Sequence, residues 1–195
     1  MTESQSNTPT VWEAGEEGGW GRPEKVTIDD NNAARSSTNN ASELYKTFGF
    51  SIPEGYDINS VKILIKCQVT DPDEAIGVAI SWDDGATYTA FTILNPYTDP
   101  PSYSTYILDA TQKTNWDADK VSKVSVKIKY SVAGGGGGGG HGPSVGELMM
   151  WTGYVDFLQV TVEYNVDQKG VMVPKPPLRT HFFFLFREWL LAKLK

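Results

Sequence analysis

Residues 61–69 read VKILIKCQV, and this stretch decides the fold class. Apolar side chains at every second position alternate with Lys62, Lys66 and Gln68, and only Leu64 departs from the pattern. Alternation of this kind is typical of a β-strand with one buried face. The same period recurs in residues 124–130 (VSVKIKY) and in residues 154–164 (YVDFLQVTVEY). The three stretches predict strands of an antiparallel sheet.

Shorter runs of β-branched and aromatic residues lie between these strands, separated by Gly, Pro, Asn and Asp. Such runs, with turn residues between them and no convincing helical period, favour strands. The sequence therefore predicts an all-β fold, an antiparallel, jelly-roll-like β-sandwich of about eight strands. The further strands are expected at residues 26–28, 44–50, 75–81, 88–94 and 103–108.

Composition shifts along the chain predict its organisation. Residues 1–24 are expected to form an N-terminal arm, and residues 25–166 the sandwich domain. Within the sandwich, residues 134–142 contain seven consecutive glycines and are expected to form a flexible loop. Residues 167–179 are a stiff, Pro-rich linker, and residues 180–195 are predicted to be a short C-terminal α-helix.

The net charge of −7 is unevenly distributed. Residues 167–195 contain six Lys or Arg against two Asp or Glu, so the acidic excess lies in the body. An acidic body gives no long-range attraction to phosphates, which argues against a nucleic-acid partner.

The first residues are polar, without the basic start and apolar core of an export signal, and no stretch has the roughly 20 apolar residues that span a bilayer. We therefore expect synthesis without a recognisable signal peptide. Cys67 is the single cysteine, so no internal disulfide forms, and its place in an apolar run predicts a buried side chain.

The C-terminal segment is too apolar to stay in water as a helix. Three placements stay open: folded back on its own sandwich, docked on another subunit, or lying in a membrane interface. The residues predicted to dock are Phe182, Phe183, Leu185, Phe186, Trp189, Leu190 and Leu194.

Residues 81–88 read SWDDGATY and resemble the Asp-box hairpin of sialidases and other β proteins, with Tyr88 in place of the usual Trp. The resemblance implies a structural turn made by Ser81, Asp83, Gly85 and Thr87. In such a turn the Asp accepts backbone hydrogen bonds and the Gly takes a positive φ.

No catalytic residues emerge from the sequence, and no enzyme activity is expected. The two histidines, His141 and His181, lie in the glycine run and at the start of the tail, away from any nucleophile pattern. No resident cofactor or metal is predicted. Acidic loops at residues 71–74, 83–84 and 117–119 raise a calcium hypothesis, but calcium needs six to eight oxygens and the sequence does not bring the loops together.

Tryptophans supply the candidates for glycan stacking. Aromatic rings pack either in a core or against the apolar face of a ligand, and both interpretations stay open here. The candidates are Trp20, Trp82, Trp116 and Trp151.

Residues 48–55 (FGFSIPEG) and 154–164 resemble a β-sandwich module of phage, viral and prokaryotic surface proteins. The resemblance implies a domain used for assembly or attachment on a virion or an extracellular particle surface. Its partners would be other virion or assembly subunits, with membrane contact through the tail. We therefore expect a structural protein displaying a sandwich and anchored by its C-terminal helix. The alternatives are a carbohydrate-binding, host-attachment module and a filament subunit that assembles by strand donation.

Overall fold

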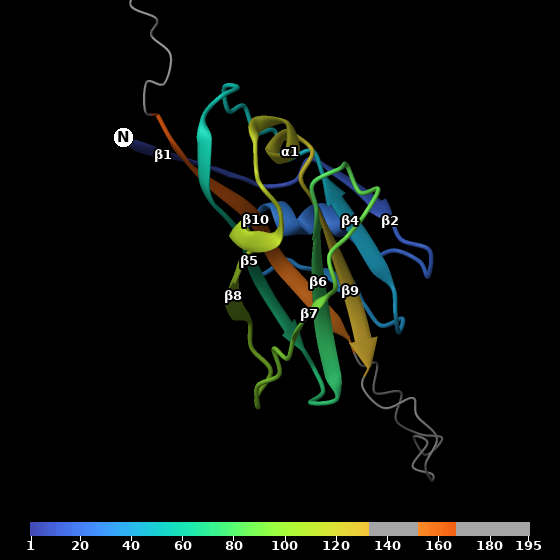
Figure 1. Cartoon of the computed structure of the whole chain (residues 1–195). Coiled ribbons are helices and arrows are strands. Elements are labelled where there is room, and N and C mark those ends of the chain that lie inside the picture. Colours follow the sequence, from blue (N-terminus) through green and yellow to red (C-terminus); the bar gives the residue numbers. More distant parts are fainter. Residues whose placement is uncertain (133–151, 167–195) are drawn as a thin grey trace, which may run out of the picture.

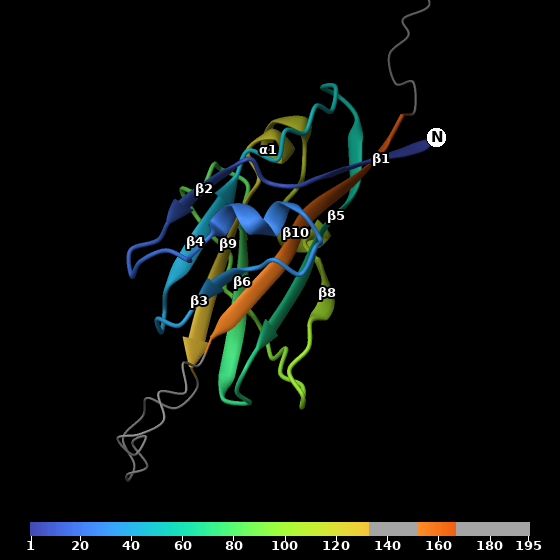
Figure 2. The same cartoon turned by 180° about the vertical axis from the view of Figure 1, so that it is seen from behind.

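The computed structural model describes residues 1–132 and 152–166, which form two five-stranded sheets packed face to face (Figures 1 and 2). The predicted all-β sandwich is confirmed. The first sheet has the order β1-β10-β5-β8, with β3 also pairing with β10; its strands are β1 (Thr2–Asn7), β3 (Ala34–Ser36), β5 (Asp57–Val69), β8 (Ser104–Asp109) and β10 (Gly153–Asn165). The second has the order β2-β4-β9-β6-β7; its strands are β2 (Val11–Ala14), β4 (Ser42–Lys46), β6 (Glu74–Ser81), β7 (Thr92–Leu94) and β9 (Ser125–Val132).

The two longest strands, β5 and β10, pair antiparallel in the middle of the first sheet. Their alternating side chains, such as Ile65 and Leu158, are fully buried between the sheets. Tyr45 and Tyr130 close the core from the second sheet. The alternation of residues 61–69 therefore places one side of β5 in the core and the other on the outer face.

β6 is buried along its whole length, unlike β9 beside it. The chain after β6 turns at residues 82–88 and runs back over the outside of the same sheet before pairing as β7 (Figure 1). The expected strand at residues 88–94 is reduced to Thr92–Leu94, and before it the Thr89 amide still donates to the Ile80 carbonyl of β6 at 3.0 Å.

The N-terminal residues differ from the expected arm, because β1 and β2 belong to the two sheets. β1 lies at a sheet edge and is held through backbone pairing with β10, a signal that its polar sequence TESQSN does not carry. The strand expected at residues 26–28 is wrong: Pro23–Thr27 form a 3-10 helix, with Pro in the first turn and Val26 buried against the core.

Helices are few among the described residues. Besides the first 3-10 helix there are a second one, Thr111–Lys113, and the five-residue α1, Ala118–Ser122. Within residues 1–132 and 152–166, none has the length and apolarity needed to cross a bilayer.

Candidate functional site

One end of the sandwich carries a cleft with a volume of about 650 Å³. It lies between the loop that leads into β5 and the segment that leads into α1, which are at the same end of the molecule (Figure 1). We call it the Trp116 cleft. Its aromatic and acidic lining residues are Tyr56, Trp116, Glu54, Asp57, Asp117 and Asp119.

Tyr56 is positioned by a turn and by a ring in the core. Gly55 has a φ of +86°, which lets the chain turn sharply just before Tyr56. The Tyr56 ring stacks on Tyr164 of β10, with centroids 6.0 Å apart and planes 12° apart. Tyr164 is itself buried, and its hydroxyl donates to Glu3 at 3.1 Å. The half-buried Tyr56 ring is therefore supported from below where it lines the cleft.

Trp116 is fixed from two sides. Its indole Nε1 donates to the carbonyl oxygen of Ala110 at 3.0 Å. Its ring meets the edge of Trp82, with centroids 6.2 Å apart and planes at 78°. A half-buried indole held by a hydrogen bond and an edge-to-face contact is already oriented before any ligand arrives.

The carboxylates of the cleft differ in how far the protein already uses them. Asp117 caps α1, with Oδ1 accepting from the Lys120 amide at 2.8 Å, and Asp119 pairs with Lys123 Nζ at 2.8 Å. Glu54 has no hydrogen bond or ion pair with any residue in the described parts of the chain. Among the residues that the structure describes, no lysine or arginine lines the cleft. The lining therefore offers hydrogen-bond acceptors and an unfavourable potential for anions.

The turn at residues 81–88 lies next to this cleft and carries Trp82. Asp83 Oδ1 accepts from the Ser81 hydroxyl at 2.6 Å and from the Thr87 amide at 2.9 Å, and Oδ2 accepts from the Thr87 hydroxyl at 2.6 Å. These hydrogen bonds, those from Ser81 and Thr87 foremost, lower the pKa of Asp83 to about 2. Gly85 has a φ of +87° and its amide donates to Ser81 Oγ at 3.0 Å. This network makes the turn a structural support for Trp82.

The four tryptophans predicted as stacking candidates lie in different environments. Trp82 and Trp116 are brought together at the cleft. Trp20 is instead a core residue: it is 5% exposed and its Nε1 donates to the Ala41 carbonyl, so it offers no stacking surface. Trp151 lies outside the described residues, as do residues 134–142 and the tail residues predicted to dock.

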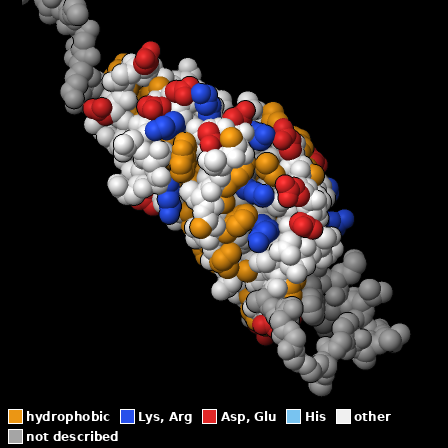
Figure 3. Space-filling view, turned by 45° about the vertical axis from the view of Figure 1, so that its right-hand side comes forward, with side chains coloured by type: hydrophobic (Ala, Val, Ile, Leu, Met, Phe, Trp, Pro, Cys, Tyr) orange, Lys and Arg blue, Asp and Glu red, His pale blue; other side chains and the backbone are white. Residues whose placement is uncertain are grey.

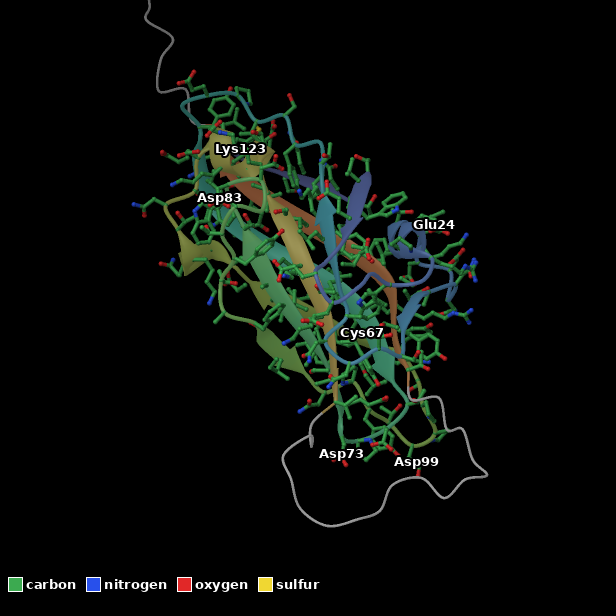
Figure 4. All side chains as sticks on the ribbon, turned by 90° about the vertical axis from the view of Figure 1, so that its right-hand side faces the viewer. Glu24, Cys67, Asp73, Asp83, Asp99 and Lys123 are labelled. Carbon is green, nitrogen blue, oxygen red and sulfur yellow. The ribbon has the colours of Figure 1, made fainter. Side chains whose placement is uncertain are left out.

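The three acidic loops of the calcium hypothesis do not all meet: the turn of Trp82 lies beside Trp116, but the loop at residues 71–74 lies elsewhere. Figure 4 shows Asp83 at one end of the sandwich, near Lys123, and Asp73 at the opposite end. In residues 1–132 and 152–166, no group of three or more His, Cys, Asp or Glu side chains is arranged to hold a metal ion. Both carboxylate oxygens of Asp83 already accept hydrogen bonds from Ser81 and Thr87 within the turn.

The sequence does not single out Tyr56, Glu54 or Asp57, and it points to Asp117 and Asp119 only through the calcium hypothesis. Tyr56 follows a turn and precedes β5, and nothing in its neighbourhood distinguishes it from a connecting residue. Its meeting with Trp116 depends on two loops 60 positions apart that only the folded sandwich brings together. The one sequence signal for this cleft is an aromatic residue followed by an acidic one, Trp116-Asp117. That pair is ambiguous, because an aspartate at this position is also typical of the start of a helix.

Comparison with known proteins gives no assignment from sequence: no family model and no curated protein matches. Among solved structures, the K1 adhesin domain of Lys-gingipain from Porphyromonas gingivalis W83 is 14% identical, with a TM-score of 0.44, and the match covers 85% of this chain and 99% of that chain. The CBM6cm-2 carbohydrate-binding module of Cellvibrio mixtus lichenase 5A, solved with cellotriose, is 10% identical, with a TM-score of 0.33 over 83% and 96%.

A third structure, the CBM36-1 domain of a multidomain xylanase from the hindgut metagenome of Trinervitermes trinervoides, is 12% identical, with a TM-score of 0.37 over 81% of this chain and 96% of that chain. At such TM-scores the likeness carries no argument about function. The functional conclusion therefore rests on the geometry of the cleft.

Proposed function

We propose that the sandwich binds a neutral oligosaccharide in the Trp116 cleft. The observation that supports this is the meeting of two supported aromatic rings, Tyr56 and Trp116, with exposed carboxylates in one cleft of about 650 Å³. Binding sites for small ligands combine an apolar surface with a few placed polar groups. A sugar matches both parts, because its C–H faces pack on aromatic rings and its hydroxyls donate to carboxylates.

The charge of the lining favours a neutral sugar. Asp117 and Asp119 are partly compensated by Lys120 and Lys123, whereas Glu54 on the other wall makes no ion pair with any described residue. A uronate or sulfated sugar would bring a second negative charge to this wall, which is unfavourable at close range. Neutral hydroxyls instead gain charge-assisted hydrogen bonds.

Isothermal titration against cello-, xylo- and galacto-oligosaccharides tests the proposal. We expect at least one series to bind, and Trp116→Ala to weaken it by about tenfold or more, since removing a stacked ring costs about 1–2 kcal/mol. Trp12→Ala is the matched control: Trp12 is 37% exposed on β2 and does not line the cleft. Equal affinity of the Trp116 and Trp12 variants would refute the proposal, as would silence of all three series.

Glu54→Gln gives a second measurement that does not depend on a packed ring. This side chain is exposed, so the substitution leaves the fold intact while it weakens acceptor hydrogen bonds to the ligand. We expect a smaller loss of affinity than for Trp116→Ala, with an unchanged melting temperature. The same samples should release no reducing ends from the bound sugar, which separates binding from hydrolysis.

The role in an assembly stays a prediction of the sequence. It depends on residues 167–195, which lie outside the described part of the chain. Deleting them should leave the oligosaccharide affinity of the cleft unchanged if the cleft is complete in the sandwich, whatever the tail contacts.

A further inference from the structure

The outer face of the second sheet carries aromatic rings beside lysines. Lys127 and Lys129 of β9 point outward from neighbouring same-face positions, while Val126 and Ile128 point into the core. Tyr88 and Phe91 come from the segment that crosses the sheet after β6, and Ile93 follows on β7. We call these five residues the lysine–aromatic face. Figure 3 shows hydrophobic side chains in a band down one side of the molecule, with Lys or Arg side chains next to it.

The two rings are seated on the sheet by specific contacts. Gly77 of β6 lies under Phe91: a Cβ at this position would be 3.1 Å from Phe91 Cδ1, so the missing side chain makes room for the ring. The Tyr88 hydroxyl lies 3.4 Å from the Ser125 hydroxyl of β9. Both rings are half-buried, and Ile93 beside them is 54% exposed. The apolar part of this face is therefore fixed and open to solvent.

Each lysine is held over one of these rings. Lys129 Nζ lies 4.8 Å from the centroid of Phe91, and Lys127 Nζ lies 5.7 Å from the centroid of Tyr88. Cation–π contacts orient an ammonium group without neutralising it. Neither lysine has an ion pair with a residue of the described segments. On the same sheet Lys46, by contrast, pairs with Glu13 at 3.0 Å.

Two uncompensated ammonium groups beside apolar rings suit a ligand with regularly spaced carboxylates and apolar faces. We propose that the lysine–aromatic face binds an acidic polysaccharide, a linear chain of uronate sugars, as a second site beyond the Trp116 cleft. The uronate carboxylates meet Lys127 and Lys129, and the sugar faces pack on Phe91, Tyr88 and Ile93. Residues two apart on a strand are roughly 7 Å apart, so an extended polymer reaches both lysines along the open sheet.

The same charges argue against nucleic acid as the occupant. Duplex DNA carries one charge per roughly 1.7 Å, and the protein as a whole has a net charge of −7, so a polymer of that charge density is repelled over most of the surface. A uronate chain carries fewer charges per unit length. It is therefore repelled less, and Lys127 and Lys129 supply local positive charge for its carboxylates.

The test uses polygalacturonate as the probe, measured by affinity electrophoresis and by titration at about 20 mM and about 200 mM salt. We expect binding that weakens at the higher salt and that falls by about tenfold in the double variant Lys127→Gln/Lys129→Gln. The matched control, Lys62→Gln/Lys113→Gln, changes the net charge equally at positions outside both sites and should bind like the unchanged protein.

Each outcome decides between the two sites. The lysine variant should keep its affinity for neutral oligosaccharides, and Trp116→Ala should keep its affinity for polygalacturonate. No binding of polygalacturonate, or an equal loss in the control double variant, overturns the inference. Equal binding of poly-glutamate, with the same dependence on the two lysines, also overturns it, because the face would then select charge without selecting a sugar.

Discussion

Asp83 shows how one carboxylate can hold a turn together. It receives hydrogen bonds from the side chain of Ser81 and from both the amide and the hydroxyl of Thr87. Asp84, the next residue, takes the left-handed conformation with a φ of 59°, and its carboxylate makes no hydrogen bond with the described residues. The two adjacent aspartates therefore have different roles. The Asp83 carboxylate accepts the hydrogen bonds of the turn, and Asp84 is a residue that tolerates the left-handed backbone conformation.

Asp83→Asn should lower the stability of the domain at neutral pH. The folded-state pKa of Asp83 is about 2, below its usual 3.8, so its ionised form stabilises the fold above about pH 4 and that contribution disappears as the pH falls toward about 2. The difference in urea midpoint between the variant and the unchanged protein should therefore shrink on acidification.

Asp84→Asn is the control for this comparison, because asparagine tolerates the left-handed backbone and no carboxylate hydrogen bond is lost. It should unfold at nearly the same urea concentration as the unchanged protein. A gap between Asp83→Asn and the unchanged protein that stays constant down to about pH 2 would count against the assigned role of the carboxylate.

At the scale of the element, the pairing of β5 with β10 contains a charged interruption. Their register shifts between Val155 and Phe157, and Asp156 at this irregularity has no exposed surface. Lys66 of β5 supplies its counter-charge, with Nζ 2.8 Å from Oδ2. The same ammonium lies 2.5 Å from Asp29 Oδ1 and 2.9 Å from Asn31 Oδ1. One lysine thus ties two strands to the loop before β3, and the contacts with Asp156 and Asp29 raise the pKa of Lys66.

Lys66→Met should destabilise the domain by about 3 kcal/mol, because it leaves the buried Asp156 without a counter-charge. The double variant Lys66→Met/Asp156→Leu should recover most of that loss, since no buried charge remains. Urea unfolding of the two single variants and the double variant measures the coupling. Additive losses in the double variant would show that the ion pair is not what stabilises this part of the sheet.

The strands that the sequence predicts well are those with one face in the core. In β5, β9 and β10, core-facing apolar residues alternate with residues on the more exposed face. This two-residue period is visible in the sequence and predicts the strands. The sequence does not predict β1, because this edge strand is held by backbone pairing with β10. Backbone pairing needs no pattern of apolar side chains, and Thr2–Asn7 have none. The run 26–28 was misassigned because its β-branched residues follow Pro23, and burial of Val26 satisfies a 3-10 helix as well as a strand.

The candidate site was less predictable than the fold. Trp82 and Trp116 could be singled out as aromatics, but burial of Trp20 could not be distinguished from exposure by residue type alone. From the sequence alone, Lys127 and Lys129 indicate only the solvent-exposed face of an amphipathic strand. Their meeting with Tyr88 and Phe91 depends on the path of the chain after β6, which no local pattern encodes.

At the scale of the whole molecule, Cys67 reports on the integrity of the sandwich. Its thiol is fully buried near the C-terminal end of β5, and burial raises its pKa to about 12 (Figure 4). Neither condition allows a reactive thiolate in the folded domain. Labelling by iodoacetamide should therefore be slow in buffer and should rise with urea in step with global unfolding. Rapid labelling without denaturant would mean that β5 opens locally, against the burial of this strand.

The pairing of β1 with β10 also has a mechanical consequence. The strands are antiparallel, Thr2 faces Asn165, and the amide of Val166 donates to the carbonyl of Met1 at 2.8 Å, so both ends of the described chain lie at one point of the edge (Figure 2). Tension applied between these two ends would load the hydrogen bonds of this pair one after another, like the teeth of a zipper. The domain should then yield at low force by peeling of β1, while the β5–β10 pair and the core stay intact.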